Sequence, residues 1–517
     1  MPVETPGQLL RTRREVLTAG IAGAFGLALA ACSGKTTKVA ASIPPAGSDL
    51  GAVEHVVFLM HENRSFDHYF GTYPGVRGFA DPTALPGVFS QAWNGSADGY
   101  DATSLLPFHL DTLTGNADCT FDLSHDWNAQ HFCWNNGAMD KWVTTHTSPQ
   151  FEGSGQGVLT MGYYTRADIP YWHALADAFT ICDNYHCSVL GPTHPNRLHA
   201  LSGTLDPAGD AGGPVLVTYS DSARLGSAHW QTMPEVLEAK GISWKVYNPP
   251  GAAFQPSSPI SLAISDNILL YFHRHVSDPS SPLYKRAFAP IFPADFRRDV
   301  MNDELPAVSW VTPPVGYDEH PPAPPAAGEW FANQVLSALV ANPKVWAKTV
   351  LFIMYDENDG FFDHVPPPVP PPATAGEYVT APHPPPPEAG IAGPIGFGFR
   401  VPMLVVSPFS RGGNVCSEVF DHTSQLLFLE QRFGVRAPNI SAWRRHTAGD
   451  LTGTLQVSHR DITVPPLPPT DARSAAVLQQ CSQGQLIELD TTNPPPFALP
   501  QPQMMPVPEQ GTRTKVG

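Results

Sequence analysis

An apolar run that changes abruptly into polar residues constrains the fold of this chain more than any other feature. Residues 56–60 (VVFLM) are apolar without a break, which is typical of a strand buried on both faces of a sheet. Residues 61–64 (HENR) follow directly. Polar side chains at the carboxyl edge of a parallel sheet are well placed to bind a ligand. On spacing alone, a strand followed by a helix cap at Asn63 or Ser65 is an equally good interpretation.

A second run of this kind lies far along the chain. Residues 349–355 (TVLFIMY) form the most convincing predicted strand, and residues 356–360 (DENDG) follow without a spacer. Acidic side chains crowded after a buried strand repel one another unless a cation lies among them. We therefore expect a cation here, with a solvated acidic turn as the alternative.

Shorter elements complete an alternating pattern. Further strands are expected at residues 242–247, 308–312 and 401–408, and helices are expected to begin near Pro170 and Trp330. Strands that alternate with helices, with candidate ligands at the strand ends, predict a three-layer α/β/α sandwich.

Composition narrows the class of protein. The 517 residues are 42% hydrophobic and only 15% charged, with 57 prolines and 43 glycines. These values favour a globular enzyme rich in loops over a coiled coil or a charged disordered chain. The net charge is −17 and there is no long basic run. Nucleic acid is therefore an unexpected partner, and attraction to anionic membrane surfaces is not favoured.

The N-terminus has the features of an export signal. Residues 12–17 (TRREVL) contain an arginine pair at the start of an apolar segment, residues 19–31. This pattern is typical of a twin-arginine signal, and the segment is too short and too rich in Ala and Gly for a membrane span. An amphipathic N-terminal helix is the alternative. We expect the twin-arginine export machinery to be a partner of this chain.

The end of the apolar segment resembles a lipoprotein processing box. Residues 29–32 (LAAC) place Cys32 where a lipid would be attached. We therefore predict a signal at residues 1–32 and a tether at residues 33–50. The lipid would hold a periplasmic or cell-envelope protein to the membrane, whereas cleavage without lipidation would give a secreted protein. The remaining cysteines are even in number, which permits disulfides, although buried free thiols are an equal alternative: Cys119, Cys133, Cys182, Cys187, Cys416 and Cys481.

The motifs together resemble a known family. Residues 61–71 (HENRSFDHYFG) are similar to the opening motif of the bacterial phospholipase C and acid phosphatase superfamily, and further matches extend from residue 55 to residue 443. The resemblance implies a fold of the alkaline phosphatase type with insertions rich in loops. We place the catalytic domain at residues 51–460 and a proline-rich tail at residues 461–517. By this resemblance, we expect the chain to lack the larger C-terminal β domains of some family members.

Thr193 is the candidate nucleophile. Residues 191–192 (GP) fix a bend that can present Thr193, and residues 195–197 (PNR) open a helix whose free N–H groups favour an anion. On this pattern alone, Thr193 could simply cap the helix. The resemblance implies that Thr193 attacks phosphorus, with Asn196 and Arg197 at the phosphate. The acid phosphatase branch has Ser at this place, so Thr193 points to the phospholipase C branch.

The resemblance also implies a metal site and a set of proton donors. All of the implied ligands are oxygen donors, which suits one hard or borderline divalent cation without fixing its identity. The implied metal ligands are Glu62, Asn63, Thr193, Asp356 and Glu357. The candidate proton donors are His125, His320 and His364, and His125 could instead contact the phosphate. Residues 363–364 (DH) could also supply a further metal ligand or support the ligands. Without the resemblance, His125 and His320 would be ordinary loop residues.

These residues predict a phosphoesterase. The expected reaction is hydrolysis of phosphatidylcholine-like phosphodiesters to diacylglycerol and a phosphorylated headgroup, through a phosphothreonine on Thr193. An acid phosphatase acting on monoesters is the first alternative. A surface lipoprotein that binds phosphorylated ligands without turnover is the second, and the intact set of ligands and nucleophile argues against it. Sulfatase chemistry would need a Cys or Ser in place of Thr193.

Overall fold

The computed structural model describes residues 49–517, except for residues 94–95, 98–99, 102, 114, 152–156, 219–223, 251–266, 381–389, 438 and 483–501. The predicted signal, with Cys32, and nearly all of the predicted tether lie outside the described residues. Within the described part of the chain, no helix is both long and apolar enough to span a membrane.

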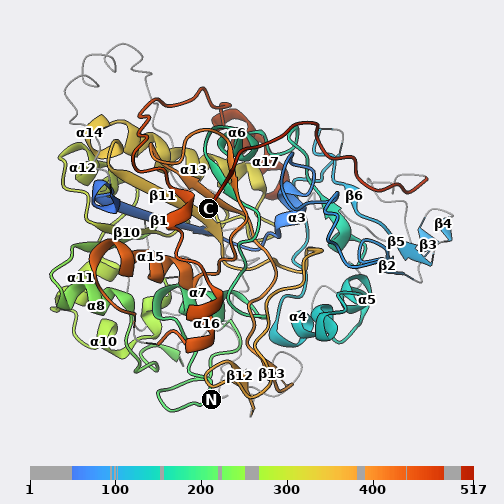
Figure 1. The fold of residues 1–517 in the computed structure, drawn as a ribbon, viewed down its shortest axis with the longest axis horizontal. Helices are drawn as coiled ribbons and strands as arrows, with labels where there is room; N and C mark the ends of the chain where they lie inside the picture. Colours follow the sequence, from blue (N-terminus) through green and yellow to red (C-terminus); the bar gives the residue numbers. More distant parts are fainter. Residues whose placement is uncertain are drawn as a thin grey trace, which may run out of the picture.

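A mixed sheet of eight strands forms the centre of the molecule (Figure 1). The strand order is β16-β15-β8-β14-β11-β1-β10-β9, and only β14 runs antiparallel to its neighbours. The strands are β1 (His55–His61), β8 (Thr180–Cys182), β9 (Trp244–Tyr247), β10 (Val308–Val311), β11 (Thr349–Tyr355), β14 (Met403–Val406), β15 (Asn414–Cys416) and β16 (Lys515–Val516). The predicted strands are confirmed, although β9 and β14 are shorter than expected.

Strands β1 and β11 are adjacent inner strands of the sheet, and both belong to the core. All residues of both strands are buried, as their unbroken apolar sequences predict. Phe58 stacks on Trp310 and Phe352 of the two neighbouring strands, with ring centroids 5.9 and 5.5 Å apart. His61 is the register partner of Tyr355, so β1 and β11 end side by side. Glu62 and Asp356 therefore leave the sheet next to each other.

Helices cover both faces of this sheet, so the three-layer α/β/α prediction is confirmed (Figure 1). One layer contains α6 (Pro170–Ala178), α12 (Ala294–Met301), α13 (Pro325–Val340), α14 (Pro343–Trp346) and α17 (Asp471–Ser482). The other contains α7 (Thr193–Ser202), α8 (Met233–Ala239), α10 (His273–Val276), α11 (Pro282–Phe288), α15 (Thr423–Phe433) and α16 (Ala442–Thr447). Helix α6 begins at Pro170 as predicted, but α13 begins at Pro325 instead of Trp330, because the fixed φ of proline suits the first helical position.

Smaller elements surround the layers. A loop-rich insertion beside the sheet carries α4 (Trp127–Trp134), α5 (Trp142–Thr147), β2 (Gln91–Ala92), β3 (Ser96–Ala97), β4 (Tyr100–Asp101) and β5 (Ser104–Leu105) (Figure 1). The others are α3 (Phe66–Phe70), β6 (Phe108–His109), β7 (Gly162–Tyr163), β12 (Tyr378–Val379) and β13 (Gly393–Pro394), with short 3₁₀ turns at Leu50–Ala52, Asn135–Gly137, Leu159–Met161, Ile268–Tyr271 and Thr452–Thr454.

The C-terminal tail contributes a helix and a strand to the fold. Helix α17 lies beside α13, and Trp330 donates a hydrogen bond to Asp471 over 2.8 Å. Strand β16 adds to the edge of the sheet next to β15. A disulfide joins Cys119 to Cys481 of α17. Four other cysteines are buried free thiols: Cys133, Cys182, Cys187 and Cys416.

Candidate metal and phosphate site

The residues after β1 and β11 pack directly against each other at the carboxyl edge of the sheet. The Asn63 amide donates to Asp356 Oδ1 over 3.2 Å, and the Glu357 amide donates to the same oxygen over 2.8 Å. Asn63 has a φ of 62°, a left-handed conformation that asparagine tolerates better than most residues. Glu62, Asn63, Asp356 and Glu357 are all fully buried. The structure thus brings together four of the five predicted metal ligands.

Thr193, the fifth predicted ligand, is the first residue of helix α7. The N-cap is Pro192, which has no side-chain capping bond, so Thr193 does not cap the helix. Thr193 is fully buried, and its hydroxyl has no hydrogen-bond partner within the described residues. Asn196 holds the preceding turn: its Oδ1 accepts the amides of Ser188 and Val189 over 2.8 and 2.9 Å. The turn and the first turn of α7 therefore fix the position of the Thr193 hydroxyl.

Arg197 connects α7 to both strand ends. Its Nε donates to Asp356 Oδ2 over 3.1 Å, and its Nη2 donates to Glu62 Oε1 over 3.2 Å. The Arg197 side chain is 6% exposed, so these are buried ion pairs. The family resemblance placed Arg197 at the phosphate, whereas its contacts in this structure are with the carboxylates of two predicted metal ligands.

The chemistry of these side chains fits a bound cation. Three buried oxygen atoms have no hydrogen-bond partner in the described part of the chain: Thr193 Oγ1, Asn63 Oδ1 and Glu357 Oε1. Burial raises the pKa of Asp356 to about 6, even though Arg197 opposes the shift. Burial, together with repulsion from Asp356 and Asp359, also raises the pKa of Glu357 well above its usual value. A hard divalent cation would neutralise such buried carboxylates and coordinate oxygens that lack a hydrogen-bond partner.

His125 lies beside both His320 and Glu357. Their ring centroids are 5.7 Å apart, and His125 Nε2 is 3.9 Å from Glu357 Oε1. In each ring Nδ1 lies against a backbone carbonyl, at 2.7 Å from Leu123 O for His125 and at 2.8 Å from Pro321 O for His320. A proton held on Nδ1 makes Nε2 the atom that can exchange a proton with a substrate. Although burial opposes it, the carboxylates of Glu357 and Asp359 raise the pKa of His125 well above its usual value.

Three residues near this site were not predicted as functional from the sequence. Asp359 accepts a hydrogen bond from His125 over 3.1 Å, and the Asp359 carboxylate also accepts the Leu123 amide. Candidate ligand atoms of Asp122, His125 and His320 lie within 4.8 Å of one another, close enough to share a cation. His422 Nε2 lies 2.6 Å from the carbonyl of Asp356. Asp122 and Asp359 each have other acidic residues close by in the sequence, and spacing alone does not show which carboxylate turns inward.

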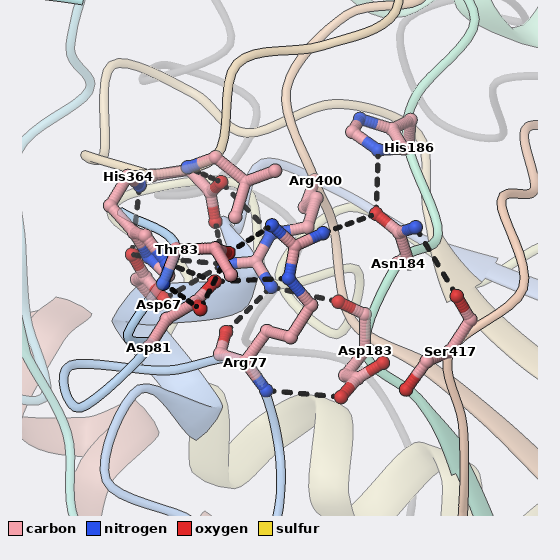
Figure 2. A network of polar contacts seen from close by, with 12 residues as sticks. Asp67, Arg77, Asp81, Thr83, Asp183, Asn184, His186, His364, Arg400 and Ser417 are labelled. Atoms are coloured by element: carbon pink, nitrogen blue, oxygen red, sulfur yellow. Dashed lines mark hydrogen bonds and ion pairs between the residues drawn. The ribbon is translucent and has the colours of Figure 1, made fainter. Parts of the chain in front are cut away.

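His364 belongs to a different set of contacts. Figure 2 shows its ring among Asp67, Asp81 and Arg400. Nδ1 lies 2.6 Å from Asp67 Oδ2, and Nε2 lies 3.3 Å from Asp81 Oδ2. Arg400 pairs with Asp67 and with Asp363, each over 3.0 Å. Both ring nitrogens of His364 are thus engaged by carboxylates that are not among the predicted metal ligands.

Known proteins resemble this chain over most of its length. The model of the Phosphoesterase family matches residues 53–436. A protein named Phospholipase C A from Mycobacterium tuberculosis is 42% identical over 513 residues, and the alignment covers 96% of each chain. A non-hemolytic phospholipase C from Burkholderia pseudomallei is 44% identical over 455 residues, which is 81% of this chain and 61% of that protein.

Solved structures show a weaker likeness. A phosphonate monoester hydrolase of Agrobacterium radiobacter is 10% identical, covers 60% of this chain and 79% of its own, and has a TM-score of 0.32. A protein of the alkaline phosphatase superfamily from Vibrio parahaemolyticus is 11% identical, covers 55% and 64%, and has a TM-score of 0.30. The family model and the relatives of high identity are decisive: this chain belongs to the phosphoesterase family.

Proposed function

We propose that the protein is a metal-dependent hydrolase that cleaves phosphatidylcholine-like phosphodiesters to diacylglycerol and a phosphorylated headgroup. The observation that carries this proposal is the buried Thr193 hydroxyl, which has no hydrogen-bond partner in the described part of the chain and comes from the helix that Arg197 ties to the buried carboxylates. The relatives named phospholipase C at 42% identity over 96% of the chain support the choice of substrate.

A bound cation and the side chains of the protein would each contribute to the reaction. Glu62, Asn63, Thr193, Asp356 and Glu357 would hold a divalent ion, which supplies charge for the phosphate oxygens and lowers the pKa of a bound hydroxyl. Thr193 Oγ1 attacks phosphorus in line with the alcohol oxygen that leaves, and its proton is lost to solvent or to a neighbouring base. The products of this step are a phosphothreonine and an alkoxide that must be protonated.

The histidines provide that proton. We assign this role to Nε2 of His125 or His320, because a backbone carbonyl holds Nδ1 of each ring. The contacts of His364 with Asp67 and Asp81 favour a structural role for that residue. Water then cleaves the phosphothreonine and releases the phosphorylated headgroup, with the deprotonated histidine as the base.

We also infer that the chain is exported. The arginine pair and the apolar segment of residues 1–32 support transport by the twin-arginine machinery, and Cys32 would receive a lipid that anchors the protein in the cell envelope. Intact-mass measurement of the wild type and of Cys32→Ser, both purified from a bacterial host with this export route, tests the two parts separately. Cleavage without added lipid mass would retain export and exclude the anchor.

The test of the enzymatic proposal compares two substrates and two variants. Hydrolysis of p-nitrophenyl phosphorylcholine and of p-nitrophenyl phosphate is measured with and without a chelator, for wild type and for Thr193→Ala. Thr423→Ala is the matched control, because Thr423 is also a buried first helical residue but its hydroxyl is bonded to Asp421. We expect turnover of the diester that is lost with chelator and in Thr193→Ala and retained in Thr423→Ala.

Other results would redirect the proposal. Turnover of the monoester alone would move the protein to the acid phosphatase branch. Equal activity in Thr193→Ala would remove Thr193 as the nucleophile. No turnover of either substrate would favour the alternative of a lipoprotein that binds phosphorylated ligands.

A further inference from the structure

The loop that carries His320 has an unusual backbone beside the site. This loop joins β10 to α13, and its residue Glu319 has a φ of 74°. Residues other than Gly, Asn and Asp rarely adopt this left-handed conformation. Glu319 is fully buried, whereas its neighbour His320 lies beside His125. The backbone at Glu319 thus sends one side chain into the core and the next one into the site.

Buried polar contacts hold Glu319 in this conformation. Arg64 donates to the carbonyl of Glu319 from Nε over 3.2 Å and from Nη2 over 2.8 Å, and it donates to the carbonyl of Ala323 over 3.1 Å. The Glu319 carboxyl accepts hydrogen bonds from the hydroxyls of Tyr69 and, over 2.9 Å, Tyr355. Arg64 and Tyr69 follow β1, and Tyr355 is the last residue of β11. The loop is therefore attached to the same two strands as the predicted metal ligands.

The neighbouring helix leaves room for this carboxyl. A Cβ atom on Gly328 of α13 would overlap the Glu319 side chain. A buried carboxyl is costly compared with an apolar side chain of similar volume, so core packing alone does not explain a glutamate here. The hydrogen bonds from Arg64, Tyr69 and Tyr355 do explain how the backbone of Glu319 is held in its left-handed conformation.

We propose that Glu319 is a positioning residue, which holds His320 at the phosphate through the contacts of its carboxyl with Tyr69 and Tyr355 and of its carbonyl with Arg64. The inference rests on the proposed phosphodiesterase function and extends it from the histidine to the residue behind it. Glu319 itself touches no reacting atom.

A double-mutant cycle tests the proposal. We expect Glu319→Ala to lower kcat for p-nitrophenyl phosphorylcholine by about 100-fold, the lower end of the range for a lost general acid, with little change in KM. We expect His320→Ala to have at least this effect. Because both changes would act through one imidazole, the double variant should be no slower than His320→Ala. Glu319→Gln, whose amide oxygen can accept both tyrosine hydroxyls, should recover most of the activity.

Two further variants separate positioning from folding. Gly328→Ala should reproduce the fall in kcat by displacing the Glu319 carboxyl. Glu329→Ala is the matched control: Glu329 is a buried carboxyl on the same helix, but it accepts the amides of Tyr171 and Trp172. It should lower the melting temperature without coupling to His320. Effects of Glu319→Ala and His320→Ala that multiply in the double variant would overturn the proposal.

A structural readout keeps this test separate from the proposed function. If the wild type turns over neither substrate, the proposed function fails, but a crystal structure of Glu319→Ala still decides the positioning role. We expect the His320 ring to leave its place beside His125 in that structure. A ring that stays in place would overturn the proposal, whatever the enzyme hydrolyses.

Discussion

Arg197 Nε donates a hydrogen bond to Asp356 Oδ2 over 3.1 Å, and this contact joins α7 to the residue that follows β11. The same guanidinium also reaches Glu62 at the end of β1. Arg197 therefore places one positive charge between two buried carboxylates that are candidate metal ligands. This side chain therefore links the helix of the proposed nucleophile, Thr193, to two of the proposed metal ligands.

This contact predicts that the effect of losing Arg197 depends on the metal. We expect Arg197→Met to destabilise the chelated protein by about 3–5 kcal/mol, because it leaves buried carboxylates without their cationic partner. A divalent cation would neutralise the same carboxylates, so the loss should be smaller in its presence. Denaturant unfolding of wild type and variant, with chelator and with added cation, measures both values. Equal losses under the two conditions would contradict this account.

The predicted ligands can be tested by binding without any assay of activity. Glu357→Gln removes one carboxylate whose Oε1 is buried and has no hydrogen-bond partner within the described residues. We expect its dissociation constant for the cation to rise by at least about 100-fold, the upper end of the effect of losing an outer partner of a ligand. Calorimetric titration also gives the stoichiometry. One bound ion per chain is expected, and two would indicate that Asp122, His125 and His320 bind a cation as well.

His125 should matter for rate more than for stability. Its ring is held by the carbonyl of Leu123 and by Asp359 at the edge of the site. If His125 is the proton donor, His125→Ala should lower kcat by about 10²–10⁴-fold, the usual range for a general acid, while the melting temperature changes little. Steady-state kinetics and thermal unfolding on the same preparation make the comparison. A large stability loss with unchanged kcat would assign His125 a structural role.

The sequence was most informative where local pattern and burial coincide. The runs that became β1 and β11 are apolar throughout because both faces are covered, so their position and the polar residues after them could be predicted directly. The helix at Pro170 was predictable for a similarly local reason, the fixed φ of proline. The antiparallel direction of β14 was not predictable, because an apolar run carries no sign of its partner's direction.

Contacts between side chains far apart in the sequence also could not be predicted from the sequence alone. His364 follows the acidic turn in the sequence, which suggested a role at the metal, but its carboxylate partners Asp67 and Asp81 come from segments almost 300 residues away. The pairing of Cys119 with Cys481 depends on where the tail packs against α13. Such contacts follow from the whole fold, since local spacing is compatible with many partners.

The disulfide predicts how the tail contributes to stability. Cys119 and Cys481 are 362 residues apart in the sequence, so the bond restricts the unfolded chain strongly. We expect the double variant Cys119→Ala/Cys481→Ala to lose about 2–5 kcal/mol of unfolding free energy. Its kcat should change little, because α17 lies on α13 and the site lies at the strand ends. Denaturant titration measures the loss, and the wild type in reductant should approach the variant. No difference between variant and wild type would show that the tail docks without the bond.

His364 predicts a stability that depends on pH. Although burial opposes it, the carboxylates of Asp67 and Asp81 raise the pKa of His364, while Arg400 opposes the shift. A raised pKa in the folded state gives a stabilising contribution that is complete below the unfolded value of about 6.5 and is lost as the pH rises through the folded value. The contribution of the imidazolium should therefore be larger at pH 6 than at pH 9.

The variant His364→Gln tests this sign and the structural role together. At pH 6 we expect it to lower the free energy of unfolding by about 2–3 kcal/mol, because charged hydrogen bonds to Asp67 and Asp81 are lost, and at pH 9 by less. Its catalytic rate at moderate temperature should stay within a few-fold of wild type, in contrast to His125→Ala. Unfolding titrations at both pH values and kinetics on the same samples provide the comparison. If the rate instead fell by about 100-fold or more, with stability unchanged at pH 6, His364 would be the proton donor.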